Sequence, residues 1–296
     1  MLNALTVDVE DYFQVTAFAG VVNRDDWSIY PSRVENNTRR VFDLLDEHSL
    51  KGTFFVLGWV AERFPGLVTE IGSRGHEVAC HGYGHELVYN QGPEAFRDDV
   101  RRTKAMLEDM TGRPVLGYRA PSYSITANSL WALDILIEEG FAYDSSIFPI
   151  HHDNYGIPGA ERFPFTVERQ AGSIVEFPLT TLALNLPGKK MVLPIAGGGY
   201  LRLLPAGIVS WGMRRINQIE KQPAVLYFHP WELDPEQPRI KVHLRSRFRH
   251  YVNLDLTEDK LRSLFKGLKF GTMAEVLGMN GDGVREKGAV HQGVLA

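Results

Sequence analysis

Two histidines separated by three residues are the part of this sequence best suited to chemistry. His81 and His85 flank Gly82-Tyr83-Gly84 and follow directly on the apolar run at 76–80. Because the two glycines disfavour a helix, we expect a tight turn that leaves a strand. Such a turn can bring both imidazoles to one metal ion, although two histidines at this spacing are by themselves more often ordinary loop residues. The interpretation as a metal site therefore depends on ionisable groups elsewhere in the chain.

Other ionisable residues recur at the ends of short apolar runs that the sequence predicts to be strands. They are Asp8, Glu10 and Asp11 at the end of 4–9, Arg119 after 115–118, Asp144 after 141–143, and His229 after 224–228. In parallel folds the carboxyl ends of the strands meet at one edge, and catalytic groups gather there. We therefore expect these side chains to converge on one mouth.

The elements that must position these residues alternate between strands and helices. Strands are predicted over 4–9, 52–57, 76–80, 115–118, 141–143, 173–177, 180–184 and 224–228. Helices are predicted over 33–47, 65–74, 93–110, 126–139, 205–221, 257–266 and 272–277, with Thr257 as an N-cap. This alternation is typical of βα units and a mainly parallel sheet. The sequence thus predicts an α/β fold of about seven parallel strands, close to a (β/α) barrel.

Composition narrows the choice of compartment and partner. The chain has 296 residues, is 44% hydrophobic and 23% charged, and has a net charge of −4. These values give no general attraction to nucleic acid, so no nucleic-acid partner is expected. The single cysteine, Cys80, excludes an internal disulfide and suits a reducing compartment. The N-terminus lacks a basic stretch and soon reaches acidic residues, so we expect neither a signal peptide nor a spanning helix, and a cytoplasmic location.

Two histidines and one carboxylate form a ligand set typical of a catalytic divalent metal. Such a metal can lower the pKa of water to about 7 and polarise a carbonyl, so a second carboxylate as base and a further histidine as acid would complete the parts for amide or ester hydrolysis. Because side chains alternate along a strand, Asp8 and Glu10 share one side, and Asp11 would need a bulge to join them. From the residues alone, any of these three carboxylates could bind the metal.

In chain order, these motifs resemble the polysaccharide deacetylases of the NodB-homology type, carbohydrate esterase family 4. The motifs are Thr6-Val7-Asp8-Val9-Glu10-Asp11, His81-Gly-Tyr-Gly-His85, Arg119-Ala-Pro121, Asp144-Ser-Ser and Leu226-Tyr-Phe-His229. The opening, the stretch Phe228-His-Pro-Trp-Glu232 and the segment 250–254 are similar to deacetylases associated with bacterial exopolysaccharide and exosortase (PEP-CTERM) gene clusters. The resemblance implies a distorted (β/α) barrel and one catalytic domain over 1–277, with a core at 4–230, an extension at 231–277 and a flexible tail at 278–296.

The resemblance also implies a role for each matching residue. Asp8 is the implied base, paired with Arg119; His229 is the implied acid, oriented by Asp144. The implied metal ligands are His81, His85 and one of Glu10 and Asp11, and the implied substrate contacts are Pro121 and Tyr123. We favour Glu10 because it shares a side of the strand with Asp8, and Asp11 is the alternative. Zn²⁺ is the first choice of metal, with Co²⁺, Ni²⁺ or Mn²⁺ as alternatives. Two positions depart from the family: Val9 stands where an aspartate usually follows Asp8, and Ser122 stands where a tyrosine usually follows the proline.

The implied reaction is removal of an acetyl group from an N-acetylated sugar, in an exopolysaccharide or its lipid-linked precursor. Membrane-associated biosynthetic machinery and the inner membrane surface are then the expected surroundings. A cyclic-amide hydrolase of the same fold and a non-catalytic carbohydrate-binding relative are the alternatives. The basic segment 239–250 is interpreted first as solvated surface, with contact to a phosphate-bearing substrate or anionic lipid headgroup as the alternative.

Overall fold

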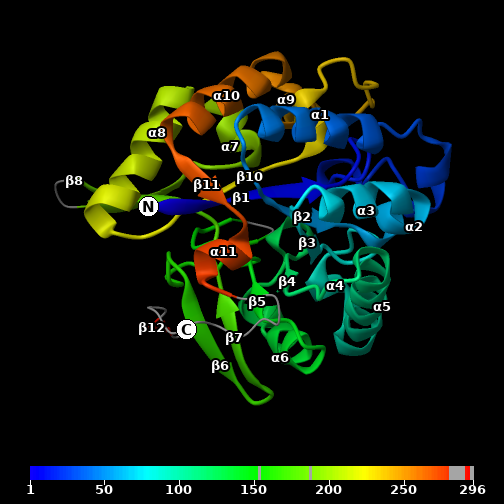
Figure 1. Ribbon diagram of the computed structural model, residues 1–296, viewed down its shortest axis with the longest axis horizontal. Helices are drawn as coiled ribbons and strands as arrows, with labels where there is room; N and C mark the ends of the chain where they lie inside the picture. The colour runs from blue at the N-terminus through cyan, green and yellow to red at the C-terminus, as the bar shows by residue number, and fades with distance from the viewer. Residues whose placement is uncertain (153–154, 187–188, 280–290, 294–296) are drawn as a thin grey trace.

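Seven parallel strands form the centre of the molecule (Figure 1). The computed structural model describes residues 1–152, 155–186, 189–279 and 291–293. In spatial order the strands are β10 (Val225–Phe228), β1 (Leu2–Val9), β2 (Thr53–Val56), β3 (Glu77–Cys80), β4 (Gly117–Tyr118), β5 (Tyr143–Asp144) and β7 (Gly172–Glu176). Each neighbouring pair runs parallel. The prediction of an α/β fold with about seven parallel strands is confirmed.

The remaining strands extend the sheet or lie beside it. At one edge β6 (Phe165–Arg169) pairs antiparallel with β7, and β12 (His291–Gln292) pairs with β6. β11 (Lys269–Gly271) pairs with the first residues of β1, while β8 (Thr181–Leu186) and β9 (Lys189–Pro194) form a separate hairpin. The expectation of a flexible tail is wrong at β12, because these residues form a ladder; residues 280–290 and 294–296 lie outside the described part of the chain.

Hydrogen bonds of one side chain, rather than a strand ladder, connect the two ends of the seven parallel strands, β7 and β10. Thr180 follows β7, and its hydroxyl accepts a hydrogen bond from Val225 N at 2.6 Å and donates one to Val225 O at 2.9 Å. On the same strand, Tyr227 N donates to Ala196 O. A Cβ on Gly197 would lie 2.0 Å from the Tyr227 ring, so this approach requires glycine. The strands therefore curve round into a distorted barrel.

Helices surround the strands, and most begin and end close to the predicted positions. They are α1 (Val34–Glu47), α2 (Gly58–Arg63), α3 (Pro65–Ser73), α4 (Val88–Gln91), α5 (Pro93–Thr111), α6 (Trp131–Glu138), α7 (Gly198–Leu203), α8 (Ala206–Arg215), α9 (Leu244–Tyr251), α10 (Thr257–Gly267) and α11 (Met273–Leu277). The predicted helix at 205–221 is α8 continued by a π-helical turn at Ile216–Glu220. Thr257 is the first residue of α10 rather than its N-cap, which is Leu256. None of the helices in the described residues is long and apolar enough to cross a membrane.

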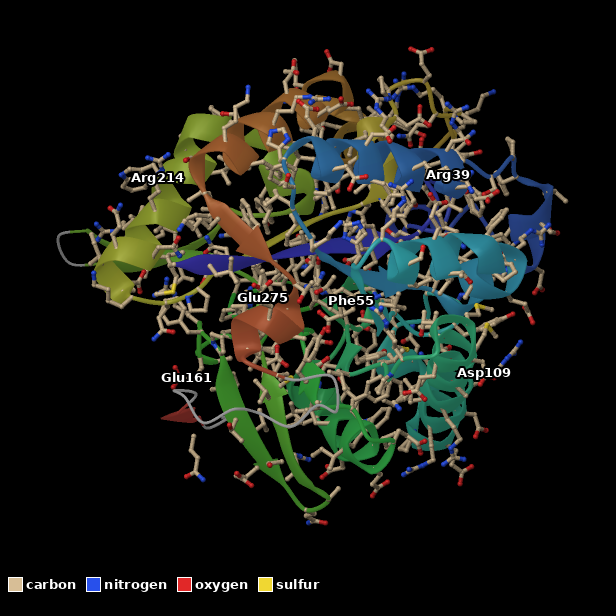
Figure 2. All side chains as sticks on the ribbon, viewed as in Figure 1. Arg39, Phe55, Asp109, Glu161, Arg214 and Glu275 are labelled. Atoms are coloured by element: carbon tan, nitrogen blue, oxygen red, sulfur yellow. The ribbon has the colours of Figure 1, made fainter. Side chains whose placement is uncertain are left out.

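The alternation of β1 decides which of its side chains reach the barrel interior. Leu5, Val7 and Val9 belong to the apolar cluster that packs against the helices, whereas Ala4 belongs to the cluster inside the barrel. Since successive side chains point to opposite faces, Asp8 lies on the interior side with Ala4. Figure 2 shows Phe55, which is fully buried, near the middle of the molecule. The strand thus delivers Asp8 to the mouth of the barrel.

The Thr180 bridge provides a test of how the barrel closes. Thr180→Val keeps the shape of the side chain but leaves the buried Val225 N–H without its acceptor, so we expect the free energy of unfolding to fall by about 1–3 kcal/mol. Thr180→Ser keeps the hydroxyl and is the matched control. Urea unfolding measures both; equal stability of the valine variant and the wild type would contradict this account of the closure.

Candidate active site

Asp8 and Glu10 come to the same cavity through a tight turn at the end of β1. Glu10 follows the last residue of the strand, and its N–H donates to Asp8 O at 3.1 Å. Both carboxylates are 2% exposed, and both line a cavity of about 670 Å³. The backbone therefore places the side chains of Asp8 and Glu10 on the same side, as expected.

The two histidines lie in the turn that follows β3, as their glycine-rich spacing predicts. His81 is buried, and its Nδ1 lies 2.7 Å from Arg119 O. A carbonyl can only accept, so Nδ1 carries the proton and Nε2 is left for a ligand bond. His85 has a left-handed backbone with φ of 50°, and Gly82 has φ of 69°. The turn folds the two rings to a centroid distance of 5.6 Å.

Glu10, His81 and His85 fit a divalent cation. One ligand atom from each of the three buried residues lies within 4.8 Å of the others. Glu10 Oε2 is buried and lies 2.9 Å from His85 Nε2, so a carboxylate oxygen and an imidazole nitrogen, both of them metal-ligand atoms, face each other. Burial would raise the pKa of Glu10, but the neighbouring His85 and His229 outweigh it and lower the pKa to about 2. Burial also lowers the pKa of His81 to about 4, which keeps it neutral and able to bind metal at neutral pH.

Asp8 is held by a buried arginine. Arg119, which is fully buried, donates from Nη1 to Asp8 Oδ1 at 2.7 Å and to Thr6 Oγ1 at 2.8 Å. Its guanidinium lies 4.1 Å from the centroid of the Phe55 ring, and Nη2 donates to Ser145 Oγ. With so many fixed contacts the arginine has little freedom, so it both orients Asp8 and balances its charge.

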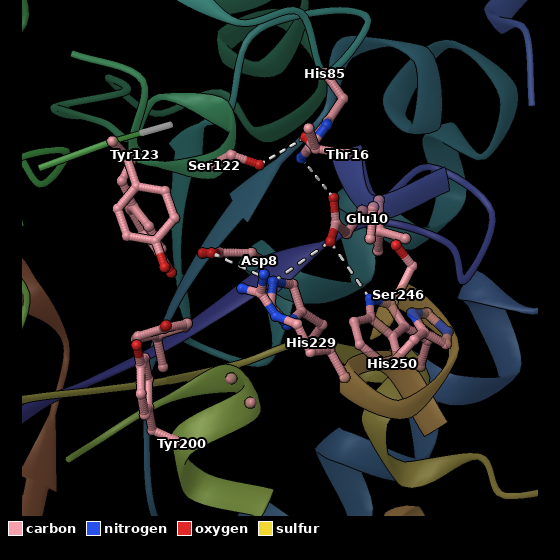
Figure 3. Close-up of a pocket in the computed structure, with 18 of the residues that line it drawn as sticks. Asp8, Glu10, Thr16, His85, Ser122, Tyr123, Tyr200, His229, Ser246 and His250 are labelled. Atoms are coloured by element: carbon pink, nitrogen blue, oxygen red, sulfur yellow. Dashed lines mark hydrogen bonds and ion pairs between the residues drawn. The ribbon is translucent and has the colours of Figure 1, made fainter. Parts of the chain in front are cut away.

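His229 lines the same cavity, where it lies on the other side of Glu10 from His85 and close to Asp8 (Figure 3). Its Nε2 is 3.3 Å from Glu10 Oε1 and 3.9 Å from Asp8 Oδ2. Its Nδ1 is 2.5 Å from Glu232 Oε1, and Glu232 is paired in turn with Arg202 at 2.7 Å. Burial opposes the charged imidazole, but Glu10, Glu232 and Asp8 outweigh it and raise the pKa of His229 to about 9.

The predicted pairing of Asp144 with His229 is wrong. Asp144 is fully buried at the end of β5, where its Oδ1 accepts from Ser146 Oγ at 2.5 Å and its backbone lies opposite Glu176 of β7. Burial raises the pKa of Asp144 to about 6 and raises that of Glu176 further, so this carboxyl pair retains a proton. The partner of His229 is Glu232. The spacing His229-x-x-Glu232 around a proline is the sequence signal that could have identified it.

Asp11 is not among the residues that could hold a metal. Its Oδ2 accepts from Ser32 Oγ at 2.6 Å, Arg33 N at 2.9 Å and Val34 N at 3.2 Å. It therefore caps the first turn of α1, where a carboxylate satisfies free backbone N–H groups. Glu10 remains as the carboxylate of the metal group.

The predicted substrate contacts differ in position. Pro121 is buried and does not line the cavity, whereas Ser122 and Tyr123 do. Both have left-handed backbones, with φ of 50° and 56°, and such strain in residues other than glycine is typical of functional sites. Tyr123 N donates to Ala120 O, so this N–H is already engaged. In Figure 3 the Tyr123 hydroxyl points into the pocket.

Much of the cavity wall comes from residues that the sequence did not single out. Trp231 donates from Nε1 to Glu10 Oε1 at 3.4 Å and stacks on His229 with ring centroids 5.1 Å apart. Further lining residues are Tyr89, Tyr155, Tyr200, Arg202, Leu203, Ser246, Arg249 and His250. Most of them lie after residue 150, where strand and helix periodicity is weaker. The aromatic residues of that region are the sequence feature that could have predicted this part of the cavity wall.

Two family models match this chain in succession. Residues 24–136 match the model described as polysaccharide deacetylase, and residues 145–278 match a domain of unknown function. A peptidoglycan-N-acetylglucosamine deacetylase from Bacillus cereus is 33% identical over 98 residues, covering 33% of this chain and 36% of the relative. A peptidoglycan deacetylase from Helicobacter pylori is 32% identical over 116 residues, covering 38% of this chain and 37% of the relative. The chain thus spans about a third of the length of these relatives.

A solved structure from Mycobacterium smegmatis, assigned as a polysaccharide deacetylase, has a similar fold. The two align with a TM-score of 0.58 and 21% identity, over 93% of this chain and 88% of the other. At this identity the likeness concerns the fold alone. It does extend through both of the matched regions, so their arrangement as one curved sheet with surrounding helices is shared.

The candidate metal ligands Glu10, His81 and His85 provide a second test. We expect the protein to bind one divalent cation, and His81→Ala to abolish that binding, because the remaining ligands cannot hold the ion alone. Asp11→Asn is the matched control: it should keep the metal but lower the free energy of unfolding by about 1 kcal/mol, because the amide loses the negative charge at the start of α1 and one of the two acceptor atoms. Elemental analysis after dialysis and thermal unfolding measure the two effects. Metal loss in Asp11→Asn together with full metal content in Glu10→Gln would reverse our choice of carboxylate.

Proposed function

We propose that this chain, whose residues 24–136 match the polysaccharide deacetylase model, is a metal-dependent hydrolase that removes N-acetyl groups from an amino-sugar-containing saccharide. The observation that carries the proposal is the placement of Asp8 and His229 beside the group formed by Glu10, His81 and His85. A hydrolase needs a proton acceptor and a proton donor next to the reacting carbonyl, and these two side chains are placed to supply them.

The chemistry that a divalent cation supplies in such a site is activation of water and polarisation of a carbonyl group. Asp8 is the proposed base: it accepts a proton from the attacking water while Arg119, 2.7 Å away, holds it in place. His229 is the proposed acid. Glu232 accepts from Nδ1, so Nε2 faces the cavity and can deliver its proton to the nitrogen that leaves as an amine.

The cavity supports a saccharide as substrate. Tyr123, Tyr155, Tyr200 and Trp231 offer aromatic surface for sugar rings, and the carboxylates and histidines supply directed polar contacts. The relatives named above are peptidoglycan deacetylases, which favours an N-acetylated sugar here too. Zn²⁺ as the metal, an exopolysaccharide or its lipid-linked precursor as substrate, and a cytoplasmic location stay predictions, as does the exosortase association.

Substrate assays separate the proposal from its alternatives. We expect the metal-loaded protein to release acetate from N-acetylhexosamine oligomers and to leave allantoin-type ring amides intact. Ring opening without acetate release would identify a cyclic-amide hydrolase. Oligosaccharide binding without turnover, at full metal content, would identify a carbohydrate-binding relative.

The role of Asp8 predicts a specific pattern. Asp8→Asn should lower kcat by about two to four orders of magnitude, because an amide cannot accept the proton, while the metal content stays at the wild-type level. Acetate release and elemental analysis on the same sample measure both. If the variant loses its metal instead, Asp8 is a ligand and the base lies elsewhere.

Glu232 is the proposed positioning residue for His229. Glu232→Gln should lower kcat by about 10- to 100-fold with little change in KM, because the imidazole loses the carboxylate that holds its tautomer and orientation. Asp144→Asn is the comparison and should keep kcat near the wild-type value, since Asp144 contacts Ser146 and not His229. The reverse ranking of the two variants would restore the role that the family resemblance implies for Asp144.

A further inference from the structure

The basic segment at 239–252 is an exposed surface with charges that the protein does not balance. It contains five Lys or Arg residues and no Asp or Glu, in a chain whose net charge is −4. The five are Arg239, Lys241, Arg245, Arg247 and Arg249, and all are exposed. Within the described part of the chain none of the five forms an ion pair, whereas arginines such as Arg74 and Arg119 have carboxylate partners. Five such cations in one short stretch give a locally positive surface.

Apolar side chains stand out from the same surface. Leu244 is 75% exposed and Phe248 is 59% exposed. Being four residues apart on α9, they lie next to each other on one face of the helix. Together with Arg239, Arg247 and Tyr251 they line a shallow groove. We call Leu244, Phe248 and the five cations the α9 surface.

The other side of α9 is fixed to the protein. His250 is 3% exposed, stacks on Trp231 with centroids 4.1 Å apart, and donates from Nε2 to Gln237 Oε1 at 2.7 Å. Its carbonyl accepts from Arg202, the partner of Glu232. These contacts fix the inner face of α9 against the protein. Leu244 and Phe248 are therefore exposed to solvent on its outer face.

The α9 surface adjoins the mouth of the active-site cavity. Ser246, Arg249 and His250 of the same helix line that cavity. On another part of the rim, Leu203 at the end of α7 both lines the cavity and is 45% exposed. Exposed apolar and cationic residues therefore border the cavity mouth, and helices that bind at a membrane surface expose the same kinds of residue.

We propose that the α9 surface docks on an anionic lipid bilayer. Leu244 and Phe248 enter the headgroup region, and the surrounding arginines contact lipid phosphates; an apolar ridge flanked by arginines is suited to both at once. A soluble polyanion would engage the charges but leave the apolar ridge in water. Docking turns the cavity mouth toward the bilayer, so the substrate class becomes a saccharide attached to a lipid. That last step rests on the proposed function, whereas the docking itself does not.

Vesicle sedimentation tests the docking with the full chain. We expect the protein to bind vesicles of phosphatidylcholine containing about one third phosphatidylglycerol, and not vesicles of phosphatidylcholine alone. Leu244→Ser with Phe248→Ser removes the apolar ridge, and Arg245→Gln with Arg247→Gln removes two charges; each double variant should bind about tenfold more weakly or worse. Arg113→Gln with Lys221→Gln removes the same charge from other exposed positions and should bind like the wild type.

Three results would overturn the docking. They are absence of binding to the anionic vesicles, equal binding to both kinds of vesicle, and wild-type binding by both α9 double variants. If a soluble polyanion binds as tightly as the vesicles do and Leu244→Ser with Phe248→Ser has no effect on either, the surface recognises charge alone and the proposal also fails. Thermal unfolding checks that the variants are folded, which is expected because the substituted side chains are exposed.

A parallel activity assay keeps the two proposals apart. Acetate release from a soluble N-acetylhexosamine oligomer should be unchanged in the α9 double variants, because none of the four residues lines the cavity. With the oligomer linked to a lipid in anionic vesicles, turnover should fall in step with binding. Vesicle binding without any acetate release would reject the proposed function and leave the docking intact. If both double variants turn over the lipid-linked oligomer as fast as the wild type does, the lipid-attached substrate is rejected.

Discussion

Two carboxylates, Asp8 and Glu10, are buried side by side at the mouth of this barrel, and most of the site follows from the need to balance them. An uncompensated charge taken out of water costs several kcal/mol, so each requires a partner of opposite sign. Asp8 obtains one from Arg119, which is itself buried and fixed by Thr6 and Ser145. Glu10 faces three imidazoles rather than a permanent cation. The arrangement is therefore suited to a bound ion.

The sequence predicted this site well wherever a residue lay at the end of a regular strand. Asp8, His81, Arg119 and His229 all follow or end buried apolar runs, and parallel pairing brings them together. Asp144 ends a strand as well, but its side chain lies with Glu176, and the direction of a side chain on a two-residue strand cannot be derived from periodicity. Asp11, the alternative metal ligand, instead accepts hydrogen bonds from Ser32, Arg33 and Val34 at the start of α1, more than twenty positions later in the chain, and periodicity does not predict such contacts. Glu232 was missed because it acts from a turn, where no strand or helix pattern marks it.

The two regions that match separate family models build one cavity between them. His81, His85 and Arg119 lie within residues 24–136, while Arg202, Glu232 and His229 lie within 145–278. The second region thus holds the histidine that faces Glu10, together with its carboxylate partner. Asp8 and Glu10 precede both matches. An account of the first region alone would contain most of the metal group but no proton donor, so the domain of unknown function has a clear place in the chemistry proposed here.

The carboxyl pair between β5 and β7 has a consequence for how the fold responds to acid. The pKa of Asp144 is raised from 3.8 to about 6 by burial, and that of Glu176 is raised further in the same direction. An unfolded chain would release these protons near pH 4, whereas the folded barrel keeps them. The folded state therefore takes up protons relative to the unfolded state as the solution is acidified from neutrality toward pH 4, and linkage makes that uptake stabilising. This carboxyl pair therefore stabilises the native state more in mild acid, and the contribution of Asp144 is lost as the pH rises through about 6.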